Sequence, residues 1–489
     1  MNGHRSRLLP LAAFLLCASA DAMAPRQSTA VTLFPANSAR DVCPDTPLRI
    51  TFSSAVSRGD RGNIRIVDAA TNLAVETIDA AASVATQNIG GMTGFNYYPV
   101  ILSGAEAEIY PRHGALQYGR SYTVTIDDGA FKDTRGGISG MVGPTAWRFS
   151  TRPDAPDSDA SKIVVSADGS GDFCTVQGAL DFLPAENTMP RTVFVRSGTY
   201  REIVFVTGKH NITLLGEDRA RTVIAYPNNA TFNASGGNPF GGANPNPGAE
   251  DPGRGGSVYR RGLLTAHRVN GLVIANLTLR NTTPQGGSQA EALILNGTAN
   301  ARAILKDIDL YSFQDTLQIN GQAYLNNCYI EGDVDFMWGT GPVFFENCHA
   351  RSVRSNAYYT QVRNPETNHG YVFFHCTLDG APGVVGNYLS RIQPDRFPGS
   401  EVVLIDSILG ASVGAAGWML QGGGSAPRIH FWEFNSHDAA GTPVDVGRRM
   451  PGSRQLKLPQ DAEIVANYSN PSFVLGGGWD PRQAAVFPP

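Results

Sequence analysis

The chain has 489 residues, of which 17% are charged and 42% hydrophobic, and a formal net charge of −4 at pH 7. That length allows two or three domains, and the charge gives no basic surface for nucleic acid. The 54 glycines and 31 prolines favour a turn-rich β architecture, and no apolar segment after residue 25 is long enough to span a bilayer.

The first 24 residues are typical of a secretory signal. Two arginines precede an apolar run from Leu8 to Ala18, and Ala22-Met23-Ala24 offers a small-x-small cleavage site. The run is short for a membrane anchor, and the leucines before Cys17 are bulky where a lipoprotein signal needs a small residue. We expect cleavage near Ala24 and a secreted or periplasmic protein.

Residues 28–152 are predicted to form a separate β-sandwich. Short, partly alternating runs are separated by turn residues, among them VTLFPA, LRITFSSAV, NIRIVD, SYTVTID and AWRFST. Their order resembles the bacterial Ig-like domains of secreted enzymes and surface proteins. The unit shows no group of catalytic residues, which indicates a spacer or a role close to carbohydrate. The polar stretch PDAPDSDAS, residues 153–161, reads as a linker.

An irregular repeat begins at Leu272. Short apolar runs end in a polar pair, and the marker residues are spaced by 31, 20, 20, 28 and 31 positions, at Asn276, Asp307, Asn327, Asn347, His375 and Asp406. A repeat of roughly 20–30 residues with one β-rich run predicts stacked coils, because a single unit cannot bury its own apolar face. Residues 228–256, rich in Asn, Gly and Pro, are predicted to form a long surface loop.

Five cysteines follow the expected cleavage site, at positions 43, 174, 328, 348 and 376. Their odd number and the lack of CxxC spacing argue against a zinc site and against a disulfide framework. Cys328, Cys348 and Cys376 occupy one column of the repeat, so we predict that they stack as small apolar residues inside the coil.

Two aspartates take equivalent places in successive repeats. Asp315 lies eight residues after Asp307, and Asp335 lies eight after Asn327. In stacked coils their backbones would be about 4.8 Å apart. Two carboxyls that close are unfavourable unless they share a proton, so the pair is a candidate acid and nucleophile. The structural alternative for either residue alone is a turn aspartate that caps an exposed loop.

Amides and aromatic side chains accompany the acid pair. Gln314 adjoins Asp315, and Gln289 lies one coil earlier. An aspartate that attacks an ester carbonyl creates an oxyanion, which uncharged amide donors stabilise. Apolar walls or a platform for a sugar ring are expected from Phe313, Phe336 and Trp338.

The block from Gln289 through Cys348, particularly SFQDTL…CYIEGDVDFMWG, resembles the pectin methylesterase family of carbohydrate esterases. The segments VSADGSGDFCTV, GTYRE, TQVRNPETNHG and Gly417-Trp418 follow in the family's order, so the resemblance covers nearly all of residues 162–481. It implies a right-handed parallel β-helix over residues 162–489. The predicted fold class is therefore all-β, a parallel β-helix preceded by an Ig-like β-sandwich.

The resemblance also implies roles for residues. The family's nucleophile falls on Asp335, its general acid/base on Asp315, and its oxyanion-stabilising amides on Gln289 and Gln314. Its nucleophile-fixing arginine falls on Arg391, with Arg396 as the alternative. The family usually reads Gly-Arg-Pro-Trp there, whereas this chain reads Ser-Arg-Ile-Gln, so the aromatic sugar contact is missing. Substrate contacts are expected from Phe313, Phe336, Trp338 and Trp418.

The expected activity is hydrolysis of the methyl esters on galacturonate units of pectin by a monomer that needs no metal or cofactor. The Asp335 anion should raise the pKa of Asp315, and the Arg391 cation should keep Asp335 ionised. Three alternatives stay open. They are a β-helical lyase or retaining glycosidase, an ester or thioester hydrolase with another substrate, and a non-catalytic carbohydrate-binding surface protein.

Overall fold

The computed structural model describes residues 30–133, 136–138, 140–141, 146–233, 260–422 and 427–484. The predicted signal segment lies outside these ranges, as does most of the predicted surface loop. In the described ranges, no helix has the length and apolar character needed to cross a membrane.

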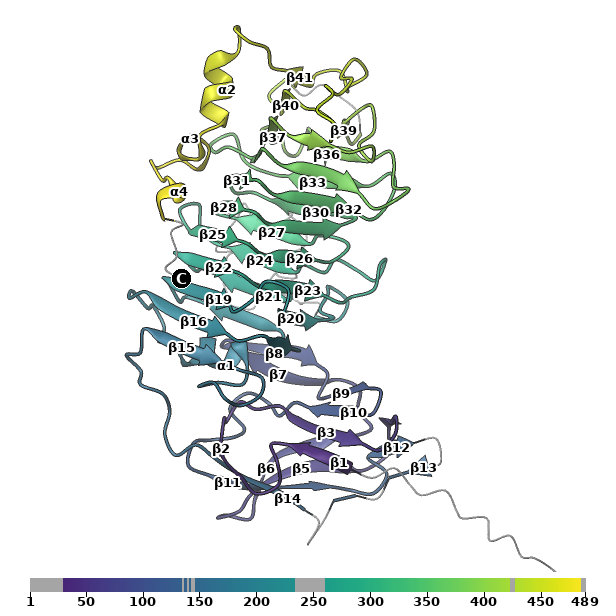
Figure 1. The fold of residues 1–489 in the computed structure, drawn as a ribbon, viewed down its shortest axis with the longest axis vertical. Coiled ribbons are helices and arrows are strands. Elements are labelled where there is room, and N and C mark those ends of the chain that lie inside the picture. The colour runs from purple at the N-terminus through teal and green to yellow at the C-terminus, as the bar shows by residue number, and fades with distance from the viewer. Residues whose placement is uncertain are drawn as a thin grey trace, which may run out of the picture.

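Residues from Lys162 onward form a parallel β-helix, built from three parallel sheets that we call the first, second and third walls (Figure 1). The first wall contains β15 (Lys162–Val165), β16 (Arg191–Val195), β19 (Ile212–Gly216), β22 (Leu272–Ala275), β25 (Arg302–Lys306), β28 (Gln322–Asn326), β31 (Val343–Glu346), β34 (Tyr371–Phe374), β37 (Glu401–Ile405), β40 (His430–Phe434) and β41 (Arg454–Gln455). The second wall contains β17 (Gly198–Tyr200), β20 (Thr222–Tyr226), β23 (Thr278–Asn281), β26 (Asp309–Tyr311), β29 (Tyr329–Gly332), β32 (His349–Ser352), β35 (Thr377–Gly380) and β38 (Ile408–Leu409). The third wall contains β18 (Val204–Thr207), β21 (Leu264–His267), β24 (Leu293–Asn296), β27 (Leu317–Asn320), β30 (Val334–Gly339), β33 (Tyr358–Val362), β36 (Tyr388–Ile392) and β39 (Trp418–Leu420).

The marker column of the repeat is a left-handed turn between the first and second walls. All six marker residues have φ between 49° and 57°, a conformation that Asn and Asp tolerate because their short polar side chains bond locally. The turns also stack, since Asn327 Nδ2 donates to Asp307 Oδ1 of the previous coil at 2.6 Å. The spacings between marker residues are therefore unequal because the loops of the coils differ in length, while the turn itself is the same in each coil.

The cysteine column follows directly after this turn. Cys328, Cys348 and Cys376 are buried in the interior of the coils, where each thiol lies 3.4–3.6 Å from two backbone carbonyl oxygens. Their surroundings agree with the predicted packing role.

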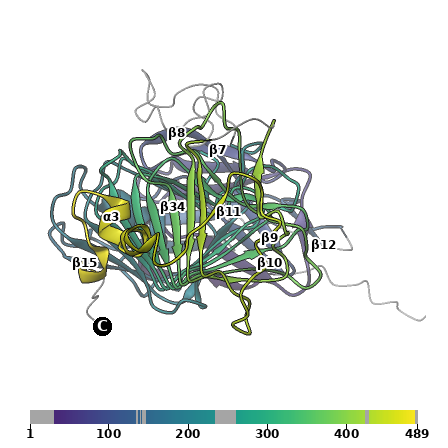
Figure 2. The ribbon, with the colours of Figure 1, turned by 90° about the horizontal axis from the view of Figure 1, so that it is seen from above.

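The C-terminal helices cover the outer face of the first wall (Figure 2). They are α2 (Ala462–Tyr468), α3 (Pro471–Leu475) and α4 (Pro481–Ala484). Tyr468, Val474 and Leu475 pack in one cluster with Tyr324 and Phe344 of that wall. This apolar cover occupies the side of the β-helix away from the third wall.

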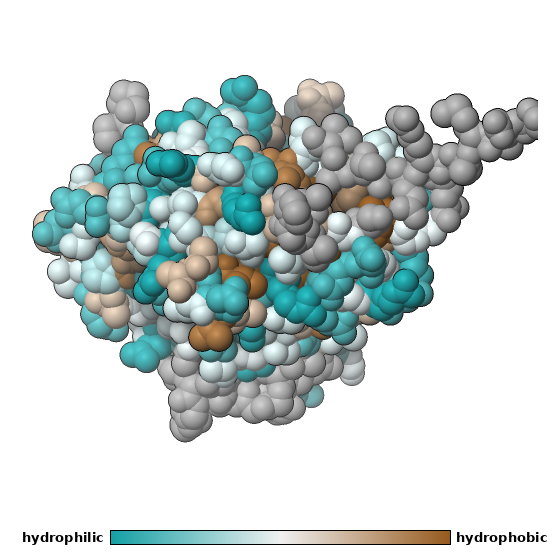
Figure 3. All heavy atoms as spheres, turned by 90° about the horizontal axis from the view of Figure 1, so that it is seen from below, coloured by the Kyte–Doolittle hydropathy of each residue, from teal (hydrophilic) through white to brown (hydrophobic). Residues whose placement is uncertain are grey.

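The N-terminal domain is a β-sandwich with a core of its own. One sheet contains β1 (Ala30–Phe34), β3 (Leu48–Phe52), β10 (Glu106–Ile109) and β9 (Val100–Ser103), and the other contains β2 (Ala39–Val42), β14 (Trp147–Thr151), β11 (Ser121–Ile126), β5 (Asn63–Asp68) and β6 (Ala74–Asp79). A small third sheet contains β13 (Gly136–Gly137), β12 (Phe131–Asp133) and β4 (Ser57–Arg58). The visible outer end of this domain is mostly polar, with scattered apolar side chains (Figure 3).

The N-terminal domain is less separate than the sequence predicted. Its hairpin of β7 (Ala85–Ile89) and β8 (Met92–Tyr97) lies across the first coils, and Ile89, Met92 and Phe95 belong to the hydrophobic core of the β-helix. The Phe95 and Phe205 rings are 5.8 Å apart. The hairpin and α1 (Val176–Phe182) therefore close the N-terminal end of the coil stack, which would otherwise expose an apolar cross-section.

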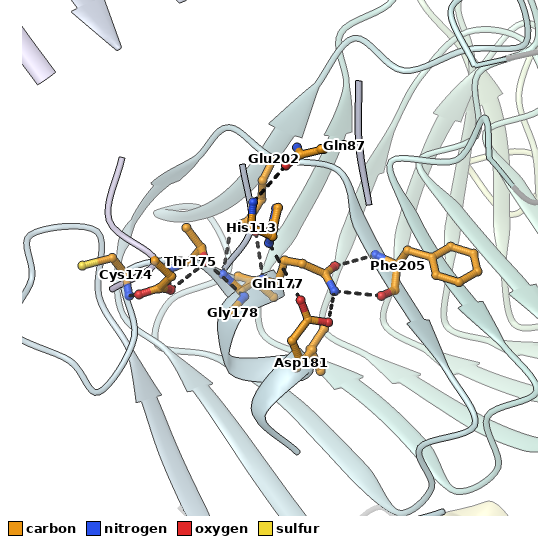
Figure 4. A network of polar contacts seen from close by, with 12 residues as sticks. Gln87, His113, Cys174, Thr175, Gln177, Gly178, Asp181, Glu202 and Phe205 are labelled. Carbon is orange, nitrogen blue, oxygen red and sulfur yellow. Dashed lines mark hydrogen bonds and ion pairs between the residues drawn. The ribbon is translucent and has the colours of Figure 1, made fainter. Parts of the chain in front are cut away.

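Two acids, Glu202 and Asp45, bind backbone N–H groups at this junction (Figure 4). Glu202 accepts the backbone N–H groups of Val176 and Gln177 at 2.8 Å each, at the start of α1. Asp45, from the N-terminal domain, accepts those of Cys174 and Thr175 at 2.8–3.1 Å. The same fold brings Cys43 and Cys174 to the junction, where each offers one ligand atom within 4.8 Å of the other and of an Asp45 oxygen. Sequence spacing could not anticipate that meeting across two domains.

Candidate active site

Asp315 and Asp335 lie in register on neighbouring coils, as the repeat predicted. The residues that precede them, Gln314 and Val334, form a parallel bridge, and Asp315 N donates to Val334 O at 3.0 Å. Asp315 is in the turn that leads into β27, and Asp335 is in β30. Both have left-handed backbones, with φ of 65° and 49°. Asp tolerates this conformation, as the marker residues of the repeat do, so the backbone alone does not set these two aspartates apart.

Asp335 is held by Arg391 in a two-point ion pair. Arg391 Nε donates to Oδ1 at 2.8 Å, and Nη2 donates to Oδ2 at 2.5 Å. The guanidinium also lies over the Tyr358 ring, with Cζ 4.1 Å from the ring centroid. Arg396, the alternative from the sequence, instead donates to Gln393 Oε1 at 3.2 Å. The geometry therefore selects Arg391 as the arginine that contacts the acid pair.

Asp315 belongs to a second cluster, which the sequence analysis missed. Arg261 Nη2 donates to Asp315 Oδ2 at 2.9 Å, while its Nε donates to both oxygens of Glu291 at 2.9 and 2.8 Å. The other Asp315 oxygen, Oδ1, accepts no hydrogen bond within the described part of the chain. One guanidinium thus serves two carboxyl groups here, whereas Arg391 serves Asp335 alone.

The pKa values of Asp315 and Asp335 have causes that differ from the predicted ones. Burial raises the pKa of Asp315 to about 8; the cation of Arg261 opposes this rise, and the anions of Glu291 and Asp335 add to it. The sequence analysis named the Asp335 anion as the cause of the raised pKa of Asp315, but the effect of burial is larger than that of Asp335. Burial also raises the pKa of Asp335, and the hydrogen bonds and charge of Arg391 oppose that rise. Arg391 was expected to lower the pKa of Asp335 and keep it ionised; it does act in that direction, but burial outweighs it, so the pKa of Asp335 lies above its ordinary value.

The two predicted amides lie beside the acid pair. Ala290 N donates to Gln314 O at 3.1 Å, which places Gln289 and Gln314 on adjacent coils, and both side chains are half-buried. Ser288 Oγ donates to Gln289 Oε1 at 3.2 Å. The amide oxygen of Gln289 is thus bound by Ser288, and an oxyanion would be bound by the amide nitrogen.

Two of the four predicted aromatic contacts are wrong. Phe336 is 0% exposed and packs on Tyr359, with ring centroids 5.3 Å apart, because successive side chains of a strand point to opposite faces and its neighbour Asp335 faces outward. Trp418 is 1% exposed, stacks on Phe431 at 4.8 Å and donates to Glu433 at 3.1 Å. Neither can contact a substrate.

The other two aromatic residues remain at the site. Phe313 is half-buried and precedes Gln314. Trp338 is 4% exposed and lies between two guanidinium groups, with Arg261 Cζ 5.7 Å and Arg363 Cζ 4.7 Å from its ring centroid. Arg363 is a second residue that the sequence analysis missed.

The fold and these side chains together define the class, a β-helical carboxylic ester hydrolase. A profile of the family described as Pectinesterase matches residues 162–240 and 252–477, and one described as Bacterial Ig-like domain matches residues 24–151. Pectinesterase 31 of Arabidopsis thaliana is 31% identical over 332 residues, which cover 66% of this chain and 93% of that relative. Pectinesterase 2 of Olea europaea is 31% identical over 341 residues, which cover 68% and 84%. The chain belongs to the pectinesterase family.

Solved structures agree with the fold. The pectin methylesterase from carrot aligns with a TM-score of 0.55 at 22% identity, covering 68% of this chain and 98% of that one. The pectin methylesterase PemA from Erwinia chrysanthemi aligns with a TM-score of 0.50 at 22% identity, covering 65% and 98%. The predicted β-helix with an N-terminal Ig-like domain is confirmed.

Proposed function

We propose that the protein hydrolyses the methyl esters of galacturonate units in pectin and releases methanol and pectate. The observation that carries this proposal is the pair of in-register aspartates, one bound by Arg391 and the other sharing Arg261 with Glu291. Membership of the pectinesterase family supports the substrate, since the relatives named above are pectinesterases and the structural neighbours are pectin methylesterases.

Asp335 acts as the nucleophile in this proposal. One of its oxygens attacks the C6 carbonyl carbon, and the resulting oxyanion is stabilised by the amides of Gln289 and Gln314. Arg391 favours the carboxylate form against the effect of burial and fixes its orientation through two parallel hydrogen bonds. The carbon–oxygen bond to the methoxy group then breaks, which leaves an acyl-enzyme on Asp335.

Asp315 acts as the acid and then as the base. Its raised pKa of about 8 keeps a proton on it at neutral pH, and this proton passes to the departing methoxy oxygen, which leaves as methanol. The Asp315 carboxylate then removes a proton from a water molecule as that water attacks the acyl carbon. Asp335 is released as a carboxylate and Asp315 is protonated again, so the cycle closes.

Substrate contacts are assigned to the residues that remain accessible around the acids. Phe313 offers apolar surface for a sugar ring, and Arg363, which lies over the buried ring of Trp338, adds positive charge that suits the carboxylates of neighbouring de-esterified units. We further propose that the protein is a monomer that acts in the periplasm or outside the cell after cleavage near Ala24.

Methanol release from highly methylated pectin by the purified protein tests this function. Release that depends on Asp335 supports it. Hydrolysis of acetylated polysaccharides or simple aryl esters without methanol release from pectin would instead assign the same acids to a different ester. Depolymerisation of pectin without methanol would favour the lyase or glycosidase alternative.

A further inference from the structure

The cluster of Arg261, Glu291 and Asp315 is buried beyond what substrate contact requires. The side chains are 5%, 0% and 12% exposed, in that order. A buried ion pair is seldom more stable than apolar residues of similar size, because both charges lose their hydration. The pair of Arg261 and Glu291 therefore calls for a role other than stability.

The backbone around Arg261 is fixed from both sides. The side-chain amide of Asn228 donates to the carbonyls of Arg260 and Gly262 at 2.7 Å each, and Asn281 donates to the carbonyls of Asn228 and Glu291 at 2.6 and 3.0 Å. Gly262 lies so close to the third wall that a Cβ atom there would be 2.7 Å from Thr265 Oγ1. The backbone of Arg261 is thus held in one position, from which its guanidinium lies beside Asp315.

We propose that Arg261 and Glu291 are positioning residues that hold the proton of Asp315 on the oxygen facing the substrate. This inference rests on the proposed function, because it assigns a task to the acid of that reaction. It adds two residues that do not touch the reacting atoms.

The geometry gives the first half of the argument. Arg261 Nη2 donates to Asp315 Oδ2, and a carbonyl oxygen accepts such a bond better than a hydroxyl oxygen does, so this bond favours Oδ2 as the carbonyl oxygen of the protonated carboxyl. The proton is therefore held on Oδ1, which accepts no hydrogen bond from described residues. That oxygen is the one available to the departing methoxy group.

The charges give the second half. An arginine beside Asp315 would by itself favour the carboxylate, which cannot act as an acid. Glu291 accepts both bonds from Arg261 Nε and a further one from Nη2. The charge of Arg261 is therefore balanced mainly by Glu291 and only weakly by Asp315. Two carboxyls sharing one guanidinium are neutral together when one of them is protonated, and Asp315, with a single bond, keeps the proton.

The other charged groups near Asp315 agree with this arrangement. Asp335 faces it from the next coil, where Arg391 balances the Asp335 charge. Arg363 follows β33 and interacts with both aspartates, so it favours the carboxylate form of each and does not distinguish them. Glu291 is the group that distinguishes the surroundings of Asp315 from those of Asp335.

Glu291→Gln is the test, because it keeps the shape and removes the charge. The unbalanced Arg261 cation should then lower the pKa of Asp315. The basic limb of the pH dependence of kcat/KM for methylated pectin should move downward by about 1 pH unit or more. Turnover at pH 8 should fall roughly 10-fold or more, with partial recovery at lower pH.

The matched control is Glu433→Gln. Glu433 is paired with Arg449 in an equally buried salt bridge, with side-chain exposures of 4% for Arg449 and 0% for Glu433, near the C-terminal end of the β-helix. This variant should lower the melting temperature without moving the pH profile. A Glu291→Gln profile that keeps its limbs while activity falls evenly at all pH values would overturn the proposal.

A second variant covers the case in which Glu291→Gln does not fold. Arg261→Leu combined with Glu291→Leu removes the buried charges together and should restore folding. If that protein melts like the wild type and keeps wild-type kcat and pH profile, the pair is only structural and the proposal fails. A low kcat with nearly unchanged KM supports it. Failure of the proposed function is distinguishable, since the wild type itself would then release no methanol.

Discussion

Acids with raised pKa values lie in two regions that can be compared, the domain junction and the outward side of the third wall. At the junction, Asp45 and Glu202 accept backbone N–H groups at the start of α1, next to a cavity of about 420 Å³. On the third wall, Asp315 and Asp335 accept hydrogen bonds from arginine side chains. Burial raises the pKa of all four acids.

The comparison shows that burial and a raised pKa do not by themselves identify an active site. The donors decide. Backbone N–H groups cannot move away, so Asp45 is fixed as a contact between the two domains and Glu202 as a cap of α1 within the β-helix. Arginine side chains on the third wall leave one oxygen of Asp315 open and place a second acid one coil away, which allows a proton to be given and taken back.

The largest effect is expected from Asp335→Asn, which replaces the nucleophile by an amide. Methanol release from pectin should fall by roughly 1,000-fold or more. The melting temperature should change little, because Asn can still accept a hydrogen bond from Arg391. Substantial turnover by the folded variant would remove Asp335 from this role.

Asp315→Asn should slow methyl ester hydrolysis by roughly 100-fold to 10,000-fold, because methoxide is a poor leaving group without a proton donor. An aryl ester whose phenol is acidic leaves more readily and should lose less activity. Parallel assays on both esters measure the difference. Equal losses would indicate that Asp315 is structural or acts mainly in deacylation.

Arg391→Ala should reduce turnover by roughly 10-fold to 100-fold and move the acidic limb of the pH–rate profile upward. Without the guanidinium, burial of Asp335 is no longer opposed, so its pKa rises further and a higher pH is needed to ionise it. Arg396→Ala is the matched control, since Arg396 lies five residues away and contacts Gln393. The assignment fails if the two variants behave in the reverse way.

The local repeat made much of the site predictable. Asp315 and Asp335 were in phase because each follows a turn residue of the same column by eight positions, and that turn is constant in the structure. Arg391 was found through its resemblance to a family motif although the neighbouring residues differ. The fold followed from the same period, since in-register coils need no knowledge of distant contacts.

The rest depended on contacts between distant residues, which a period does not reveal. Arg261 meets Asp315 across 54 positions, after a segment without apolar periodicity. The available signal was Glu291, a charged residue inside the apolar run AEALIL, which indicates a buried partner. Phe336 was assigned to the site although it follows the outward-facing Asp335, so strand alternation points it into the core. The packing of the hairpin on the β-helix is a contact between domains, which the pattern of residues 28–152 does not reveal.

The smallest effect is expected at the junction, where Glu202→Gln should change stability and leave turnover unaltered. Burial raises the pKa of Glu202 from 4.5 to about 7, and the backbone N–H groups of Gln177 and Val176 oppose that rise. Between these two values the folded protein holds a proton that the unfolded chain has lost. The stabilisation is therefore complete below pH 4.5 and is lost as the pH rises through 7, by on the order of 3 kcal/mol.

Gln cannot ionise, so the variant should lose this part of the pH dependence. Melting temperatures at pH 5 and pH 8 measure it, and the comparison is the difference between the two proteins, because Asp45 and Asp181 titrate in both. The gap between the two melting temperatures should shrink in the variant, while kcat and the pH–rate profile for pectin stay those of the wild type. A shifted pH–rate profile with unchanged melting would mean that the junction acids act on catalysis, and the division between capping acids and catalytic acids would not hold.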